Sequence, residues 1–313
     1  MSRGSRFAPD PFSLPVQPRI LVISPVHNEA AHIERVARAL AVQELPPARW
    51  IVVDDGSSDD TLAIIRRLER EIPFMTAVER AALPEGPVRD RLARAAAPRT
   101  FNAGLALADV TEYTHVMKLD GDIELRPAYF RELMQRFEAE PALGLAGGVL
   151  DEPLPDGRMR RLKIAPQHVH GALKLYTREC FERIGGIEER LGWDTIDETY
   201  ARMRGFTTRS FTDLVSIHHR PLGSADGTVR GHARHGECAY IAHYTTTWVA
   251  LRAIKVGTRR PAVLSGLAFF YGFARAAARR VERVPDPDYR RFTRSELRRR
   301  MLGAVAPRYQ GAP

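Results

Sequence analysis

Cysteine is scarce in this sequence. The 313 residues include only Cys180 and Cys238, which excludes a disulfide framework, and neither has the spacing of a metal-ligand pair. We therefore expect two buried free thiols. Internal repeats and low-complexity tracts are also absent, and hydrophobic residues make up 44% of the chain. This composition is typical of an ordinary globular protein.

Long hydrophobic runs are missing as well. Residues 1–18 lack the apolar core of a secretory signal, so we expect a flexible lead-in and a cytoplasmic protein. Residues 238–251 and 261–274 are apolar, but runs of about 14 residues are short of the roughly 20 that cross a bilayer. They fit helices that lie in a membrane interface with arginines at the headgroups. The alternative is two helices that pack on the protein's own core.

Charge is unevenly distributed. Residues 252–313 contain 15 Lys and Arg against 4 Asp and Glu, whereas residues 1–251 contain 32 basic and 34 acidic side chains. A basic tail favours an acidic partner such as a membrane surface, a nucleic acid or an anionic polymer. The apolar segments at 238–251 and 261–274, before and within this tail, favour a peripheral contact with the inner face of the cytoplasmic membrane.

Strand and helix patterns alternate through the first part of the chain. Apolar runs at 19–26 and 48–55 are each followed by an amphipathic helix, which predicts a parallel sheet with helices packed on it. Residues 80–100 are rich in proline and arginine, and we expect a mobile loop there. Further strands are expected at 115–119, 143–150, 171–176 and 208–220. Further helices are expected at 101–109, 127–140, 177–186 and 195–205.

The run "HVMKLDGD" ends a predicted strand with Asp120 and Asp122. Two carboxylates at i and i+2 turn toward the same place, and their hard oxygens suit Mg²⁺ or Mn²⁺ rather than zinc. A divalent cation bound to a diphosphate would offset their repulsion. The alternative is a solvated turn.

A second acidic turn, "VVDDGSSDDT", places Asp54 and Asp55 at the end of another predicted strand, where open α/β sheets bind ligands. A carboxylate there accepts hydrogen bonds from a nucleobase or a ribose. No G-x-G-x-x-G follows the first strand, which argues against a dinucleotide site. The alternative is a plain acidic turn with helix caps.

Together, "SPVHNE", "VVDDGSSDDT" and "KLDGD" resemble the family 2 inverting glycosyltransferases with the GT-A fold. The resemblance runs from about Arg19 to about Arg220, roughly two thirds of the chain. It implies a Rossmann-like α/β fold, with a mostly parallel sheet and helices on both faces. We expect a lead-in at 1–18, the GT-A domain at 19–237, and a basic, amphipathic helical region at 238–313.

The resemblance also implies site residues. Asp122 would be the principal ligand of Mn²⁺ or Mg²⁺, with Asp120 or His218 as further ligands. Residues implied in nucleotide binding are Ser24, Pro25, Glu29, Asp54, Asp55 and Asp120. Contacts to the diphosphate would come from His219, Arg220 and Arg234, because arginine forks suit phosphate oxygens. The histidines could instead be structural.

An inverting transfer needs a general base on the acceptor hydroxyl. In the family an acidic pair opens a late helix, and here the matching stretch is "GWDTIDETYARMRGF". Its three acidic residues are Asp194, Asp197 and Glu198, which a helix places on one face. We take Asp197 as the base and Asp194 as its main competitor. The alternative is that two of the three acidic residues only interact favourably with the helix dipole at the start of the helix.

The Gln-x-x-Arg-Trp motif of processive relatives is absent, which favours single-sugar transfer. We therefore expect transfer of one hexosyl or N-acetylhexosaminyl group from a nucleoside-diphosphate sugar, UDP first, to a glycan or lipid-linked acceptor. A nucleotidyltransferase would need a glycine- and lysine-rich loop that "SPVHNEA" lacks. A non-catalytic protein with its tail on nucleic acid is the third alternative, but no nucleic-acid motif is present.

Overall fold

The computed structural model describes residues 17–80, 95–154, 156–220, 227–258 and 261–303. The expected lead-in at 1–18 falls almost wholly outside these residues. Within them the chain forms a nine-stranded sheet. Its strands are β1 (Ile20–Val26), β2 (Arg49–Asp54), β3 (Met75–Glu79), β4 (His115–Leu119), β5 (Ile123–Glu124), β6 (Leu143–Pro153), β7 (Met159–Arg161), β8 (Leu173–Thr177) and β9 (Thr207–His218).

The strands follow the order β3-β2-β1-β4-β8-β6-β9-β5, and β7 pairs with β6. Strands β3, β2, β1 and β4 are parallel, as are β6 and β9, while β8 runs antiparallel to both of its neighbours. The mostly parallel sheet expected from the sequence is confirmed. Because parallel strands end at one edge, the turns after β1, β2 and β4 lie together.

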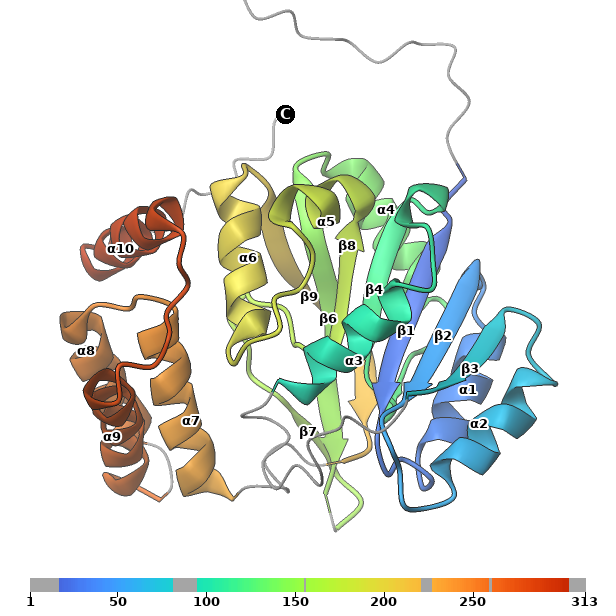
Figure 1. Ribbon diagram of the computed structural model, residues 1–313, viewed down its shortest axis with the longest axis horizontal. Helices are drawn as coiled ribbons and strands as arrows, with labels where there is room; N and C mark the ends of the chain where they lie inside the picture. The colour runs from blue at the N-terminus through green and yellow to red at the C-terminus, as the bar shows by residue number, and fades with distance from the viewer. Residues whose placement is uncertain (1–16, 81–94, 155, 221–226, 259–260, 304–313) are drawn as a thin grey trace, which may run out of the picture.

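Helices cover both faces of this sheet, as predicted. Those in the sheet layers are α1 (Ile33–Ala41), α2 (Thr61–Glu69), α3 (Ala96–Leu105), α4 (Tyr129–Ala139), α5 (Arg178–Ile184) and α6 (Trp193–Met203), with a 3₁₀ turn η1 (Val110–Glu112). Figure 1 shows α3, α5 and α6 in front of the sheet. Two separate cores result, one under α1, α2 and α4 and one under α3, α5 and α6.

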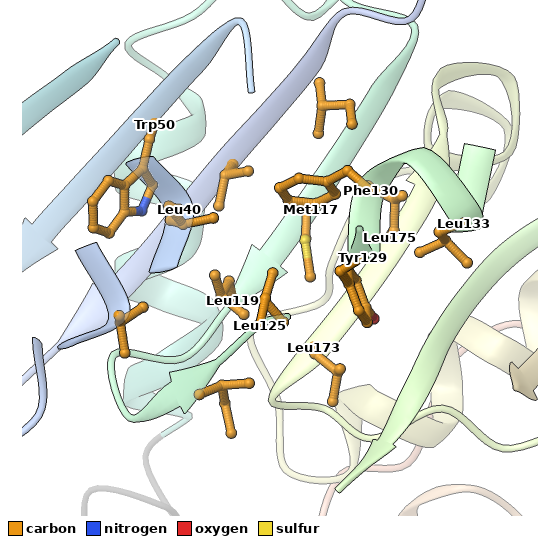
Figure 2. Packing of buried hydrophobic residues seen from close by; sticks show 14 of the residues in the cluster. Leu40, Trp50, Met117, Leu119, Leu125, Tyr129, Phe130, Leu133, Leu173 and Leu175 are labelled. Carbon is orange, nitrogen blue, oxygen red and sulfur yellow. The ribbon is translucent and has the colours of Figure 1, made fainter. Parts of the chain in front are cut away.

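Side-chain alternation along the strands explains the two cores. On β4, Met117 and Leu119 face the core under α4, whereas Val116 faces the other core. Figure 2 shows Met117 and Leu119 packed with Leu173 and Tyr129. This alternation buries both faces of a central strand, and even the polar Lys118 of β4 is buried.

The stretch expected as a loop at 80–100 needs a correction. Residues 81–94 lie outside the described residues, but α3 already begins at Ala96, earlier than the helix expected at 101–109. Pro98 obscured this start in the sequence. A proline in the first turn is tolerated because the N–H that it lacks has no helical partner there.

Four more helices follow the sheet: α7 (Thr228–Ile241), α8 (Thr246–Gly257), α9 (Leu264–Ala278) and α10 (Pro287–Met301). They gather beyond α6 in Figure 1, and α7, α8 and α9 share a small core of their own. Helix α7 runs across position 237/238, where the sequence placed a domain boundary. Cys180 is buried, as expected, and Cys238 on α7 is only partly buried.

Among the residues described, no helix combines the length and the apolar character needed to cross a bilayer.

Candidate active site

The turns after β1 and β2 are held together by side-chain hydrogen bonds. Ser57 donates its backbone N–H to Asp54 Oδ2 at 3.1 Å, and Asn28 Oδ1 accepts from the backbone N–H of Ser58 at 2.8 Å. Asn28 adopts a left-handed conformation (φ 55°), which an Asn tolerates better than most residues. Asp54 therefore supports the turn that follows β2.

Asp55 lies just beyond the end of β2. Its backbone N–H bonds to Val26 O at 2.9 Å, and its carboxylate is 3.2 Å from Arg80 Nη1. Arg80 also donates to Thr100 at 2.8 Å. An arginine directly after β3 thus orients the carboxylate of Asp55, the residue expected to contact the nucleobase.

Ser24 departs from the expectation. It is completely buried in β1, and its hydroxyl accepts a hydrogen bond from the Trp50 indole at 2.9 Å. In this position it packs inside the sheet and does not line an open pocket. Pro25, by contrast, is only partly buried next to it in β1.

Asp120 and Asp122 follow β4, as the sequence indicated. Asp120 is paired with Lys118, whose ammonium also donates to Gly171 O at 2.9 Å. Asp122 is buried, and its Oδ1 has no hydrogen-bond partner among the described residues. A buried, unpaired carboxylate oxygen is costly unless a cation or a donor meets it.

The other oxygen of Asp122 faces the end of β9. His218 Nε2 lies 3.5 Å from Asp122 Oδ2, and Arg220 Nε lies 4.0 Å from it. The structure therefore brings together three residues that the sequence analysis assigned to one site. Burial alone would lower the pKa of His218, but its hydrogen bond to Asp122 and the nearby negative charges raise it above the ordinary value.

Glu152 on β6 was not predicted. It is fully buried, and its Oε1 lies 3.3 Å from His218 Nδ1. The histidine thus stands between two carboxylates. The only signal in the sequence was a pair of acidic residues, Asp151 and Glu152, at the end of an apolar strand.

Glu29 adds a further carboxylate to this edge. It is buried, and its Oε2 accepts from Arg220 Nη2 at 2.6 Å. Burial and the charge of Asp122 raise the pKa of Glu29 to about 8, although Arg220 acts in the opposite direction. Glu29 is therefore mostly protonated near pH 7, and a cation bound beside Asp122 would favour its ionised form.

Asp122 Oδ1 is the carboxylate oxygen at this edge that is available to a divalent cation. No group of three or more His, Cys, Asp or Glu among the described residues has the arrangement of a complete metal site. Mg²⁺, however, is commonly held by one or two carboxylates together with substrate phosphates. The partnerless Oδ1 of Asp122 and the acidic surroundings are suited to that kind of shared coordination.

His219 is directed differently from His218. Its Nε2 lies 2.7 Å from Glu124, its Nδ1 lies 3.1 Å from Arg35, and its ring stacks on His32. Both ring nitrogens are thus occupied, which favours the structural alternative for this residue. Arg234 lies partly buried on α7.

The three acidic residues of α6 have different surroundings. Asp197 is buried and accepts hydrogen bonds from Lys174 at 2.8 and 2.9 Å and from the Tyr176 hydroxyl at 2.5 Å. Glu198 is also buried, and it accepts from His168 at 2.9 Å and from the backbone N–H of Val169 at 2.7 Å. Both carboxylates are engaged inside the protein.

Asp194 is the more exposed of the three. It lies in the first turn of α6, beside Gly171, where an added Cβ would be only 3.2 Å from Asp194 Cβ. The backbone oxygen of Gly171 in turn accepts a hydrogen bond from Lys118, and the same lysine pairs with Asp120. Asp194 is therefore linked to the edge that carries Asp120, whereas Asp197 points into the core.

Solved structures with the same fold include a mannosyltransferase from Pyrobaculum calidifontis in complex with GDP-Man and Mn²⁺. The likeness has a TM-score of 0.54 at 21% identity and covers 95% of this chain and 88% of that one. Residues 1–349 of S. aureus TarS, in complex with UDP-GlcNAc, give a TM-score of 0.52 at 15% identity and 83% and 73% coverage. At these identities the likeness shows the GT-A fold.

Sequence comparison gives a second line of evidence. The uncharacterized protein MT1568 of Mycobacterium tuberculosis (strain CDC 1551 / Oshkosh) is 31% identical over 134 residues, which are 42% of this chain and 36% of that protein. The chain thus spans about a third of the curated relative that it matches. Residues 21–196, more than half of the chain, match Glycosyl transferase family 2. The chain therefore belongs to Glycosyl transferase family 2 and has the GT-A fold.

Proposed function

We propose that the protein is a metal-dependent, inverting glycosyltransferase that moves one sugar from a nucleoside-diphosphate sugar to an acceptor hydroxyl, in cell-surface polysaccharide or glycolipid synthesis. The observation that carries the proposal is the buried, unpartnered Oδ1 of Asp122, set beside Glu29 and His218 at the edge where β1, β2 and β4 end. Family membership decides against a nucleotidyltransferase.

The donor would lie along this edge of the sheet. Asp55 would accept hydrogen bonds from the base, and Asp120 would reach the ribose or a metal-bound water. Asp122, with Asp120 and His218, would hold Mn²⁺ or Mg²⁺. When bound, the ion supplies Lewis-acid stabilisation of the charge on the departing diphosphate. Arg220, already 2.6 Å from Glu29, is the arginine placed to meet the phosphate oxygens.

The reaction would be a single displacement. The acceptor oxygen forms a bond to the anomeric carbon, the bond from that carbon to the diphosphate oxygen breaks, and the acceptor proton passes to a carboxylate. We assign this proton to Asp194, because Asp197 and Glu198 are buried and engaged. Lys174 also bonds to the backbone oxygen of Asp194, which fixes the base on the first turn of α6.

The neighbours of known structure support two donors for a test, since one holds GDP-Man with Mn²⁺ and another UDP-GlcNAc. Calorimetry would measure binding of UDP and GDP with Mn²⁺, Mg²⁺ or a chelator to the wild type and to Asp122→Asn. We expect metal-dependent binding of one diphosphate that the variant loses. Asp213→Asn is the matched control, because Asp213 is an exposed acidic residue paired with Arg136.

Transfer activity would follow with the sugars of the nucleotide that binds. If the folded wild type binds neither diphosphate under any of these conditions, the proposal is wrong. The protein would then be a member of the family that has lost its donor site.

A further inference from the structure

Large apolar side chains are exposed on the neighbouring helices α8 and α9 and at Val263, directly before α9. They form what we call the α8–α9 apolar face, defined by Leu251, Ile254, Val263, Leu264, Leu267, Phe270 and Tyr271. These residues make up more than half of the large hydrophobic side chains that are exposed in the described part of the chain. A patch of this kind marks an interaction site more often than a solvated surface.

The opposite side of α9 already packs against its neighbours. A Cβ added at Gly272 would lie 1.8 Å from Ala233 O, and one at Gly266 would lie 2.3 Å from Ala253 O. Backbone-to-backbone contact thus joins α9 to α7 and to α8. Most of the exposed face is left out of this packing, and Arg275 is the only charged residue in α9, so the helix carries apolar side chains well beyond the side that α7 and α8 cover. Such a helix needs a second apolar environment.

A wide-open cavity of about 730 Å³ lies between α7 and α9, and part of the apolar face lines it. Its walls include Val229, Ala233, Leu264, Leu267 and Tyr271, and Arg230 supplies a positive charge. Apolar walls next to a guanidinium suit an acyl chain whose phosphate lies at the opening.

The surrounding charge has one sign. Between Glu237 and Glu282 the sequence has seven basic residues and no acidic one. Arg252 and Lys255 on α8 and Arg279 just beyond α9 are exposed. A second copy of this face would bring like charges together, which disfavours a dimer. An anionic lipid surface complements both the charge and the apolar side chains.

We propose that the α8–α9 apolar face and the adjoining cavity dock the protein on an anionic lipid bilayer. The helices lie in the plane of the interface, because 12 and 15 residues are fewer than the roughly 20 that cross it. Leu267 and Phe270 enter the acyl region, and Arg252, Lys255 and Arg279 lie among the headgroups.

Docking in this position also indicates the kind of acceptor that reaches the site. That inference rests on the proposed function. Helix α7 lies between the docked surface and the candidate base, since a Cβ added at Gly192, directly before α6, would be 3.2 Å from Cys238 Cβ. Asp194 lies in the first turn of that helix. The arrangement suits an acceptor whose sugar is carried on a membrane lipid.

Vesicle flotation tests the docking with the full chain. We expect the wild type to float with phosphatidylcholine vesicles that contain phosphatidylglycerol, less with pure phosphatidylcholine, and less at high salt. Leu267→Glu should weaken binding about tenfold or more, since it removes a leucine from the acyl region and adds a negative charge. Val42→Glu is the matched control, because Val42 is 62% exposed and Leu267 is 61% exposed.

Several results would overturn the proposal. These are failure of the wild type to bind anionic vesicles, equal losses in Leu267→Glu and Val42→Glu, or light scattering that shows a dimer abolished by Leu267→Glu. Nucleotide binding measured on the same samples separates the two proposals. A wild type that binds nucleotide but not anionic vesicles rejects only the docking, and a wild type that binds these vesicles but no nucleotide rejects only the donor site.

Discussion

Lys174 donates hydrogen bonds to both carboxylate oxygens of Asp197, at 2.8 and 2.9 Å, and neither side chain is accessible to water. The lysine comes from β8 and the aspartate from α6, so this pair ties the helix that carries the candidate base to the centre of the sheet. Tyr176 completes the set by donating to Asp197. Together these hydrogen bonds hold α6 in place.

We expect Lys174→Met to destabilise the protein by about 3–5 kcal/mol, because it leaves a buried carboxylate without its cation. Urea unfolding measures the change. Arg66→Met is the control, since Arg66 pairs with Glu79 at 2.6 Å while both side chains are more than half exposed. The free energy of unfolding of Arg66→Met should fall by less than about 1 kcal/mol. Equal losses in the two variants would contradict the role given to Lys174.

The neighbouring pair of Glu198 and His168 predicts how stability changes with pH. Burial would raise the pKa of Glu198, but Lys174 and His168 outweigh it and lower the pKa from 4.5 to about 2. The carboxylate therefore contributes stability above about pH 4.5 and loses it as the pH falls toward 2. The pKa of His168 is raised above 6.5 because Glu198 outweighs its burial. Its contribution is complete below pH 6.5 and is lost as the pH rises.

Glu198→Gln should therefore lower the free energy of unfolding most between about pH 4.5 and 6.5, by on the order of 3 kcal/mol. The difference from the wild type should shrink toward pH 2 in urea unfolding. Glu179→Gln changes an exposed glutamate on α5 and should show a small difference at every pH. A cost of Glu198→Gln that does not vary with pH would disprove the coupling.

The strand ends of the candidate site could be predicted from the sequence, and the reason is geometric. Asp54 ends one short strand and Asp120 follows another, and parallel strands place their ends at one edge whatever the loops between them do. The proximity of Asp122 and His218 could also be predicted from the sequence, because His218 ends the last long strand of the sheet.

The orientation of α6 could not be predicted in the same way. The helical period puts Asp194, Asp197 and Glu198 near one another, but the residue that faces the core depends on Lys174 and Tyr176, which lie on a strand more than 15 residues away. Strand β8 is inserted antiparallel between β4 and β6, and no local pattern announces this. A lysine in an apolar strand was the only available signal.

Two glycines of α7 provide a test of the packing below the α8–α9 apolar face. A Cβ at Gly236 would lie 1.9 Å from Phe269 O, whereas nothing lies within 4 Å of one at Gly231. Gly236→Ala should therefore destabilise the protein by about 3 kcal/mol or more. Gly231→Ala should stabilise it by about 1 kcal/mol, since alanine is the better helix former. Thermal unfolding of both variants measures the difference, and changes of the same sign would refute the close packing of α7 and α9.

The assignment of the base predicts opposite results for two aspartates only three residues apart. Asp194 is partly exposed at the start of α6, so Asp194→Asn should reduce kcat by about 10²–10⁴ while nucleotide binding and stability hardly change. Asp197→Asn should instead lower the free energy of unfolding, because Lys174 loses its charged partner. Sugar transfer, calorimetry and urea unfolding on both variants separate the roles. If Asp194→Asn keeps full activity, or if Asp197→Asn is stable but inactive, the base is Asp197, as first expected from the acidic pair in the sequence.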